Sequence, residues 1–447
     1  MSCLEINGGR SLYGTVSVQG SKNAVLPMMA AALLNKGITV IKNVPYILDV
    51  CYMIKIMNAL GCRVKYEQGT LTMDASCLTA NELPLMWAGK MRSSIMLLGA
   101  LIGRCREAVT YYPGGCSIGA RPIDLHIEGL RKLGVTFLFE GDRIEAKAEK
   151  LTGAQIVLPF PSVGATENIL LAAVNAEGVT CIRGAAREPE IVELCGMLNQ
   201  MGALISGVGS DTLMVHGTDC FRDCLVKASG DRIVAATYLM AAAACRGEVM
   251  LTGAPSAYMQ SSLAVLRQMG CLIRQEAERI VICADKAPLP IPYTKTAPYP
   301  GFPTDVQSQL MAVLCFSEGT SVIEEAIFEG RFNTAWELKK MGADIIIEGR
   351  LAVIHAGTPL RGTCVEAKDL RGGAALVIAG LAAEGRTQIQ SCHHIFRGYA
   401  GIEFDLQQLG ADIIADHGSS DCGTVNYGND SNVNPGKSGF GQAVQMA

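Results

Sequence analysis

A short pattern that recurs six times along the chain constrains the fold more than any other feature. It consists of the end of an amphipathic helix, a glycine and an alternating strand, and its glycines are Gly61, Gly134, Gly202, Gly270, Gly342 and Gly410. By subtraction of their positions, these glycines lie 73, 68, 68, 72 and 68 residues apart. Leucine and methionine at helical spacing face a core, and the glycine favours a left-handed turn that ends the helix. The chain is therefore expected to contain six related units.

A second pattern lies about midway between these glycines. It is a helix of small residues that ends in glycine before a strand, as in AAALLNKGITVI and AGLAAEGRTQI, and the copy near Leu97–Val109 is degenerate. Such alanine-rich helices indicate buried helices with closely packed backbones. Each unit is thus expected to hold two helices and several strands.

The number of units predicts the domain organisation. A chain of 447 residues is too long for one hydrophobic core, and six units fit two α/β domains of three units each. The chain begins partway through a repeat, so its first strand is expected to pair with the second half. We therefore predict one domain at 22–229 and another formed by 1–21 and 230–416. Residues 417–447 are rich in Gly, Ser and Asn, and are expected to be disordered or loosely attached.

Composition excludes several classes of protein. A hydrophobic content of 49% with 18% charged residues is typical of a globular protein, and a net charge of −4 argues against a nucleic-acid partner. The first residues lack the features of a signal peptide, and the apolar runs are too short to span a bilayer. Seventeen cysteines without framework spacing fit a reducing cytoplasm. Zinc-like spacing and nucleotide-binding glycine loops are missing, so we expect no metal, no cofactor, no membrane association and no obligate protein partner.

One cysteine differs from the others in its surroundings. Cys116 lies in YPGGCSIGARPIDLH, after two glycines and five residues before Arg121. A thiol near a cation can have a lowered pKa and become reactive. Free cysteine is more often a small buried hydrophobe, and we assign that role to the cysteines in or beside apolar runs: Cys3, Cys51, Cys62, Cys105, Cys181, Cys195, Cys245, Cys271, Cys283 and Cys315.

Charged residues at the start of apolar helices form a second group of candidates. Lys22 and Asn23 stand where a glycine turn enters a helix, and could bind an anion there; alternatively Lys22 reaches solvent while Asn23 caps the helix. Asp305 follows a proline-rich segment, and is either a helix cap or a general base at a rigidly held position.

Two arginines repeat the arrangement of Lys22. Arg92 and Arg371 also precede apolar helices, and Arg397 stands before a Gly-Tyr turn. A basic residue at a helix N-terminus is unfavourable for the helix dipole, so the repetition suggests a shared bound anion. The alternative for each is a surface salt bridge.

Six segments together resemble the enolpyruvyl transferase family: GSKNAVLP, PGGCSIGARPIDLH, AAREPEIV, YPGFPTDVQSQ, FEGRF and HIFRGY. The resemblance extends to about residue 416 and implies that family's fold, two inside-out α/β domains of three units each. It also implies transfer of an enolpyruvyl group from phosphoenolpyruvate to the 3′-hydroxyl of UDP-N-acetylglucosamine, with release of phosphate, in the first committed step of peptidoglycan synthesis. The cysteine loop argues against the sister synthase that acts on shikimate 3-phosphate.

The resemblance also implies a role for each candidate residue. Cys116 would protonate the substrate methylene and Asp305 would accept the sugar hydroxyl's proton, with Lys22 and Arg397 completing the catalytic set. The phosphate and carboxylate of phosphoenolpyruvate would be bound by Lys22, Arg92, Arg121, Arg371 and Arg397. The sugar nucleotide would contact Asn23, Arg121, Pro122, Asp124, Leu125, Ser162, Val163, Gly164, Asp305, Ile327 and Glu329.

Two further alternatives stay open from the residues. An RNA 3′-phosphate cyclase shares the repeat unit more distantly, but would need a nucleotide-binding histidine and a more basic face. A non-catalytic sugar-nucleotide-binding relative would keep the pocket and lack turnover; the joint presence of Lys22, Cys116, Asp305 and Arg397 argues against it. A two-domain enzyme is expected to close on its substrates and exclude water.

Overall fold

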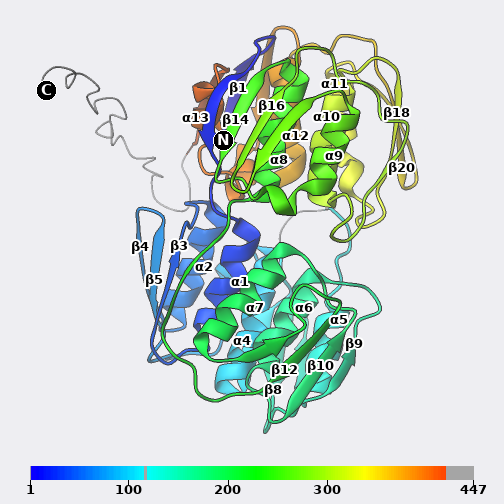
Figure 1. Cartoon of the computed structure of the whole chain (residues 1–447). Coiled ribbons are helices and arrows are strands. Elements are labelled where there is room, and N and C mark those ends of the chain that lie inside the picture. The colour runs from blue at the N-terminus through cyan, green and yellow to red at the C-terminus, as the bar shows by residue number, and fades with distance from the viewer. Residues whose placement is uncertain (1, 115–117, 419–447) are drawn as a thin grey trace, which may run out of the picture.

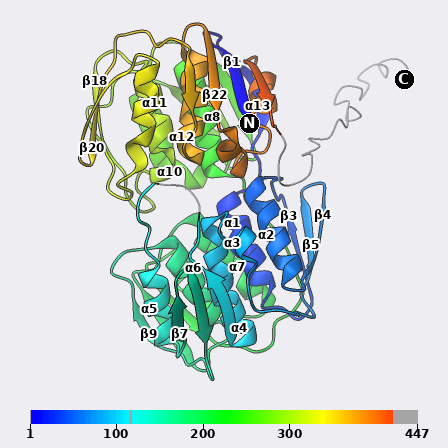
Figure 2. The ribbon, with the colours of Figure 1, turned by 180° about the vertical axis from the view of Figure 1, so that it is seen from behind.

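The computed structural model describes residues 2–114 and 118–418, so Cys116 and the segment 419–447 lie outside the described residues. Two bodies stand one above the other in Figure 1, and Figure 2 shows them from behind. The lower body has a hydrophobic core drawn from residues 24–228, and the core of the upper body is drawn from 4–18 and 233–413. We propose 22–229 and 1–21 with 230–416 as the corresponding domains.

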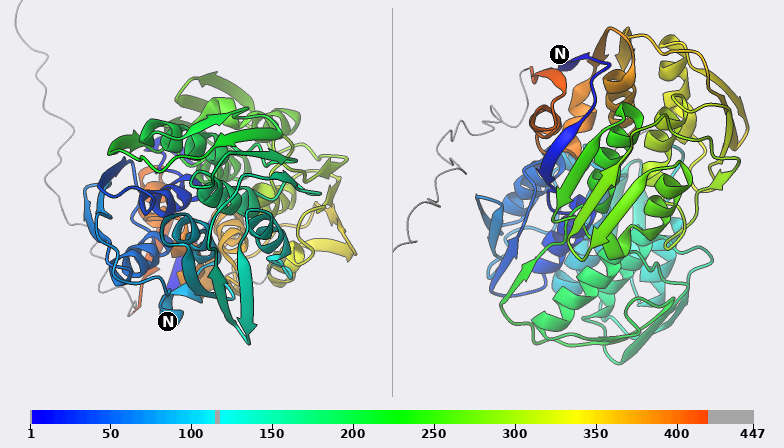
Figure 3. Two further views of the ribbon diagram at one scale, coloured as in Figure 1. Left: turned by 90° about the horizontal axis from the view of Figure 1, so that it is seen from below. Right: turned by 45° about the horizontal axis from the view of Figure 1, so that its top comes forward.

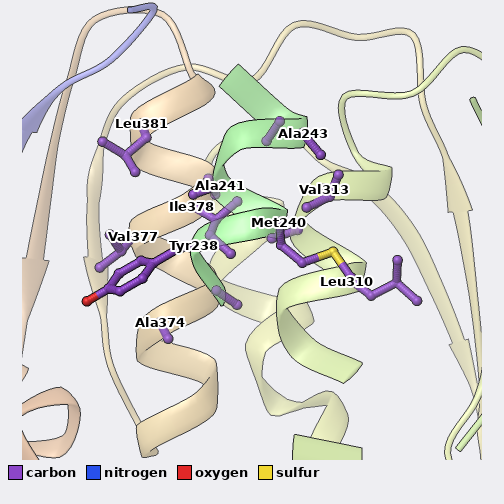
Figure 4. Packing of buried hydrophobic residues seen from close by; sticks show 14 of the residues in the cluster. Tyr238, Met240, Ala241, Ala243, Leu310, Val313, Ala374, Val377, Ile378 and Leu381 are labelled. Carbon is purple, nitrogen blue, oxygen red and sulfur yellow. The ribbon is translucent and has the colours of Figure 1, made fainter. Parts of the chain in front are cut away.

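Each body is built around three helices that are buried along their length. They are α1 (Lys22–Ala32), α4 (Met96–Cys105) and α6 (Val163–Ala173) below, and α8 (Arg232–Cys245), α10 (Thr304–Leu314) and α12 (Leu370–Ala382) above. In the upper body Met240 of α8, Leu310 of α10 and Ile378 of α12 point into one cluster (Figure 4). Small side chains such as Ala241 and Ala374 occupy the same cluster and leave room for close packing. The predicted buried helices are confirmed.

The amphipathic helices end as the repeat predicts. They are α2 (Leu48–Ala59), α5 (Asp124–Lys132), α7 (Pro189–Met201), α9 (Gln260–Gln268), α11 (Thr334–Lys340) and α13 (Ile402–Gln408). Each is followed by its repeat glycine, whose φ lies between 91° and 115°. A side chain at such a position would strain the backbone, which explains why the pattern needs glycine. Shorter helices are α3 (Leu85–Ala88) and the 3-10 helices η1 (Arg92–Ile95), η2 (Ser256–Tyr258), η3 (Arg331–Asn333) and η4 (Cys392–Arg397).

Within the described residues, each body contains three sheets, and in Figure 3 the strands surround the helices. The lower sheets, in spatial order, are β13 (Cys224–Lys227), β3 (Ile38–Lys42), β5 (Thr70–Asp74) and β4 (Arg63–Glu67); β6 (Glu107–Tyr111), β8 (Arg143–Lys147) and β7 (Thr136–Glu140); and β11 (Leu204–Ser206), β12 (Thr212–His216), β10 (Val179–Arg183) and β9 (Gln155–Val157). The upper sheets are β15 (Leu272–Glu276), β16 (Arg279–Cys283), β14 (Glu248–Thr252) and β2 (Tyr13–Ser17); β17 (Thr294–Lys295), β18 (Thr320–Glu324), β20 (Leu351–His355) and β19 (Asp344–Glu348); and β21 (Cys364–Glu366), β22 (Arg386–Gln390), β1 (Cys3–Asn7) and β23 (Asp412–Asp416). The three-stranded sheet belongs to the unit whose sequence is degenerate.

The first strands of the chain complete the upper body, as predicted. β1 lies between β22 and β23, antiparallel to both, and β2 pairs with β14 in parallel. The part of the chain that the structure describes passes between the bodies twice, and the two crossings lie side by side. Gly20 bridges Gly230, and the Ser21 N–H donates to the Ser229 carbonyl at 2.9 Å.

The C-terminal boundary needs one correction. His417, which the sequence assigned to the loose tail, places Nε2 2.9 Å from Glu403 Oε1 and packs its ring against Phe396. Those contacts attach residue 417 to the upper body. None of the described helices is long and apolar enough to cross a membrane.

Candidate active site

A cavity of about 510 Å³ is lined by residues of both bodies. Every predicted site residue within the described ranges contributes to its wall. These are Lys22, Asn23, Arg92, Arg121, Pro122, Asp124, Leu125, Ser162, Val163, Gly164, Asp305, Ile327, Glu329, Arg371 and Arg397. These residues come from eight separate segments of the described chain and meet at one place, while Cys116 lies outside the described residues.

Lys22 and Arg397 meet at a carboxylate that the sequence did not single out. Asp49, on the first turn of α2, is only 1% exposed. The Lys22 ammonium lies 3.2 Å from one of its oxygens, and the Arg397 Nε, from the upper body, lies 2.8 Å from the other. Burial alone would raise the pKa of Asp49, but the two cations outweigh burial and hold it below its ordinary value. This ion triad links the two bodies at the cavity.

The alternatives drawn for Lys22 and Asn23 are wrong in part. Ser21, not Asn23, caps α1, and its hydroxyl accepts from the Ala24 N–H. Lys22 does not reach into open solvent, because its side chain is only 12% exposed and is paired with Asp49. The pair is nearly buried and is therefore no surface salt bridge.

Asp305 stands in a second group of charges, on the upper side of the cavity. It does not cap α10, whose N-cap is Pro303 without a side-chain bond, so that alternative is wrong. Its carboxylate accepts from Arg331 at 3.1 Å and lies 3.5 Å from Arg371 Nε. Burial raises the pKa of Asp305, while Arg371 and then Arg331 lower it further than burial raises it, so that the net shift is well below the ordinary value. The carboxylate keeps 30% of its surface open.

Arg92 and Glu329 both bind the backbone around Arg121. The Arg92 guanidinium donates to the carbonyls of Arg121 and Pro122. Burial and the charge of Arg121 lower the pKa of Arg92 to about 10. Glu329 Oε1, from the upper body, accepts from the Ala120 N–H at 2.9 Å. The anion predicted near Arg92 would therefore meet an arginine already engaged with carbonyl groups.

The remaining wall is formed by the N-terminal ends of α5 and α6. Ser162 caps α6, and its hydroxyl accepts from the Ala165 N–H at 3.3 Å. His126 lies 4% exposed beside Gly164, where any added Cβ would come within 3.1 Å of the imidazole. Asn168 Nδ2 lies 3.0 Å from His126 Nδ1, while its Oδ1 accepts from the Gly99 N–H. The amide thus donates to Nδ1, which leaves the proton on Nε2.

The surroundings of His126 also keep its imidazole neutral. Burial, followed by the charges of Arg92 and Arg121, lowers the pKa of His126 to about 3. The imidazole is therefore a neutral donor near the helix N-termini. The Ile327 N–H donates to Glu325 at 2.8 Å, and the predicted contact of Ile327 with the sugar nucleotide stays a prediction.

An acidic wall completes the cavity. Glu190 pairs with Arg232 at 3.2 Å, and Glu188 accepts from the Tyr299 N–H at 3.3 Å. Glu167 is 4% exposed, and burial together with Glu190 and Glu188 raises its pKa well above the ordinary value. Sequence reasoning missed these groups as site residues, and also Asp49, Arg331 and His126. The segments AAREPEIV and FEGRF contain Glu188, Glu190 and Arg331, so a signal was present for those; Asp49 lies in a helix without a local motif.

The cysteines of the apolar runs are mostly buried, as expected. Seven are buried: Cys51, Cys62, Cys181, Cys195, Cys245, Cys271 and Cys315. Cys3, Cys105 and Cys283 are partly exposed. Burial raises the pKa of Cys195, Cys245 and Cys315 to about 12, so these thiols stay protonated and unreactive at neutral pH.

Comparison with known proteins places this architecture in a family. The family model described as EPSP synthase (3-phosphoshikimate 1-carboxyvinyltransferase) matches residues 6–406. A protein of Caldanaerobacter subterraneus named UDP-N-acetylglucosamine 1-carboxyvinyltransferase 2 is 47% identical over 93% of this chain and 99% of its own length. A protein of Halothermothrix orenii named UDP-N-acetylglucosamine 1-carboxyvinyltransferase is 45% identical over 91% and 98% of the two chains.

Solved structures agree with this assignment. The enolpyruvyl transferase NikO from Streptomyces tendae superposes with a TM-score of 0.85 at 28% identity, covering 94% of this chain and 99% of its own. EPSP synthase from Acinetobacter baumannii gives a TM-score of 0.72 at 19% identity over 93% and 100% of the chains, and shares the fold. The predicted fold of two α/β domains built from repeated units is thus confirmed, and the chain belongs to the EPSP synthase family of enolpyruvyl transferases.

Proposed function

We propose that this protein transfers the enolpyruvyl group of phosphoenolpyruvate to the 3′-hydroxyl of UDP-N-acetylglucosamine and releases phosphate. This reaction is the first committed step of peptidoglycan synthesis, and we propose that it takes place in the cytoplasm. The observation that carries the proposal is that two cation groups line one cavity, Lys22 and Arg397 around Asp49 and Arg331 and Arg371 around Asp305. The names of relatives 43–47% identical support the choice of acceptor.

Phosphoenolpyruvate suits these cations. Its phosphate and carboxylate carry close to three negative charges at neutral pH, and arginine binds such groups bidentately. Lys22, Arg371 and Arg397 are at present balanced by Asp49 and Asp305. The substrate would share these cations with the two carboxylates, so that neither the protein nor the substrate leaves buried charge uncompensated.

Substrate charge also prepares Asp305 to act as a base. A carboxylate whose pKa is held low by Arg371 and Arg331 is ionised but weakly basic. An anion bound to the same arginines offsets their charge and raises the pKa of Asp305 toward its ordinary range. Asp305 would then accept the proton of the sugar 3′-hydroxyl while that oxygen forms its bond to C2 of phosphoenolpyruvate.

The sugar nucleotide would lie along the other wall. Helix N-termini attract phosphate groups through their free N–H groups, and the starts of α5 and α6 both face the cavity. Ser162, Val163 and Gly164 at α6 and Arg121 near α5 would bind the diphosphate. Pro122, Asp124 and Leu125 would surround the uridine, and Asn23 would hold the sugar beside Asp305.

Cys116 would have the role that the family resemblance implies, delivery of a proton to the methylene carbon of phosphoenolpyruvate. That proton and the bond to the sugar oxygen give a tetrahedral intermediate, which loses phosphate and a methyl proton to form the enol ether. Since the intermediate hydrolyses in water, the reaction requires an enclosed site between the bodies.

Phosphate release tests the proposal directly. The protein is incubated with phosphoenolpyruvate and either UDP-N-acetylglucosamine or shikimate 3-phosphate, before and after treatment with fosfomycin, an epoxide expected to alkylate the loop cysteine. Release that needs the sugar nucleotide, and is lost together with a mass increase on the Cys116 peptide, supports the proposal. Cys220→Ala, which removes an exposed cysteine, is the matched control and should keep both activity and sensitivity. If the protein releases no phosphate with UDP-N-acetylglucosamine and none with shikimate 3-phosphate, the proposed function is refuted.

A further inference from the structure

The turn that carries Arg121 is held from both bodies at once. Arg121 has φ of 44°, a left-handed conformation that is strained for a residue with a long side chain. Such strain persists only where surrounding contacts hold the backbone. The contacts here come from Arg92 below, which donates to the carbonyls of Arg121 and Pro122, and from Glu329 above, which accepts from the Ala120 N–H.

The upper-body contact is closely fitted. A Cβ added to Gly119, whose φ is 144°, would lie 2.8 Å from the Glu329 carboxylate. The Gly330 N–H donates to the Ile118 carbonyl at 3.0 Å, so two hydrogen bonds join 118–120 to 329–330. The two segments lie so close together that a side chain at either Gly119 or Gly330 would collide with the opposite segment.

An aromatic ring extends this junction towards Asp305. Phe328 lies with its ring 5.4 Å from the Arg121 guanidinium and 5.3 Å from that of Arg331. Arg331 is in turn the residue that donates to Asp305. Residues 328–331 therefore connect the Arg121 turn, where the nucleotide would bind, with Asp305, the proposed base.

We propose that Glu329 is a positioning residue: by accepting from the Ala120 N–H, it fixes the Arg121 turn in the conformation that directs the guanidinium to a nucleoside diphosphate. Arg92 holds the same turn from the lower body. Because Glu329 belongs to the upper body, diphosphate binding is coupled to the relative position of the two bodies. This deepens the proposed function, on which it rests, and gives Glu329 a role other than direct contact with the sugar.

UDP is the probe for the test, with affinity measured by calorimetry on the full chain. Glu329→Ala should weaken UDP binding about fivefold, the loss expected for one hydrogen-bond acceptor, while the thermal midpoint stays unchanged because Glu329 is exposed. Glu329→Gln keeps an acceptor oxygen and should restore most of the affinity. Glu348→Ala, which removes an exposed carboxylate at the end of β19, is the matched control and should bind UDP like the wild type.

The decisive comparison is made in the Arg121→Ala background. If Glu329 acts through Arg121, adding Glu329→Ala there should weaken UDP binding no further, whereas independent sites would give additive losses. Hydrogen exchange of the segment around Ala120 should also accelerate in Glu329→Ala alone. Additive losses, or a Glu329→Ala protein with wild-type affinity and exchange, would overturn the inference while leaving enolpyruvyl transfer intact. A wild-type protein that neither releases phosphate nor binds UDP would overturn both.

Discussion

Replacement of Asp49 by asparagine is the sharpest test of how the two bodies are joined. At an effective dielectric constant of about 20, unit charges at the observed separations of 3.2 Å to Lys22 and 2.8 Å to Arg397 attract with about 5 and about 6 kcal/mol. Desolvation of the carboxylate offsets most of this, and removal of one partner from a buried ion pair costs about 3–5 kcal/mol. Asparagine has about the same size as aspartate and keeps one acceptor oxygen. We therefore expect the free energy of unfolding to fall by about 3 kcal/mol, the lower end of that range.

Urea unfolding at pH 7 measures that loss, with Asp412→Asn as the control. Asp412 pairs with Arg10, whose side chain is 61% exposed. Loss of this exposed ion pair should change the free energy of unfolding by less than about 0.5 kcal/mol. Phosphoenolpyruvate should stabilise Asp49→Asn more than the wild type, because it supplies charge to the two cations left without their partner. Unfolding energies of Asp49→Asn and wild type that agree within about 0.5 kcal/mol would refute the reasoning.

The pH dependence of the same pair has a definite sign. The pKa of Asp49 is lower in the folded protein than in the unfolded chain, so the triad stabilises the protein above the unfolded value of about 3.9. That contribution is lost as the pH falls through the lower folded pKa. The stability curves of wild type and Asp49→Asn should therefore converge below about pH 4 and separate at neutral pH.

Three further predictions concern the cavity. Asp305→Asn should lower kcat for phosphate release by a factor of about 10²–10⁴, and an unchanged rate would remove Asp305 as the base. Arg371→Lys keeps a charge but loses the bidentate fork, so KM for phosphoenolpyruvate should rise at least about tenfold; Lys368→Gln, which removes an exposed cation paired with Glu337, should leave KM as it is. Because the pKa of His126 falls to about 3 on folding, the unfolded chain binds more protons between about pH 6.5 and that value, and stability declines with acidification across this window. His126→Gln should reduce the slope of unfolding free energy against pH in this window, as measured by urea unfolding. A slope identical to that of the wild type would contradict a neutral, buried His126.

Much of the fold could be predicted because each copy of the repeat shows, in its local sequence, where a helix ends and a strand begins. The six glycines mark helix ends through a backbone requirement that no other residue meets as well, so the pattern can be found although the residues around each glycine differ from unit to unit. The pairing of the first strand with the second half followed from the register of the repeat. The alternative in which Asn23 caps the first helix was wrong. Ser21 and Asn23 are both residue types that suit a cap, and the sequence does not show at which residue the helix begins after the chain crosses between the bodies.

The site was predictable in part for a similar reason. Lys22, Arg371 and Arg397 stand out because a cation at the start of a buried helix or turn is unusual locally. Asp49 could not be found in this way, since a carboxylate in the first turn of α2 is what any helix favours. Its importance arises from Arg397, 348 residues away in the chain, and only the folded arrangement brings the two together.

The insertion of β1 between β22 and β23 has a consequence for biosynthesis. Cys3 pairs with Asp416, so the strand made first must wait for nearly the last residues of the described chain before its sheet can form. The lower core, which draws on 24–228, can assemble on the ribosome meanwhile. At translation rates of about 5–20 residues per second, the interval lasts on the order of tens of seconds. During that time β1 exposes an unpaired, partly apolar strand, and the upper body can be completed only after β23 has been synthesised.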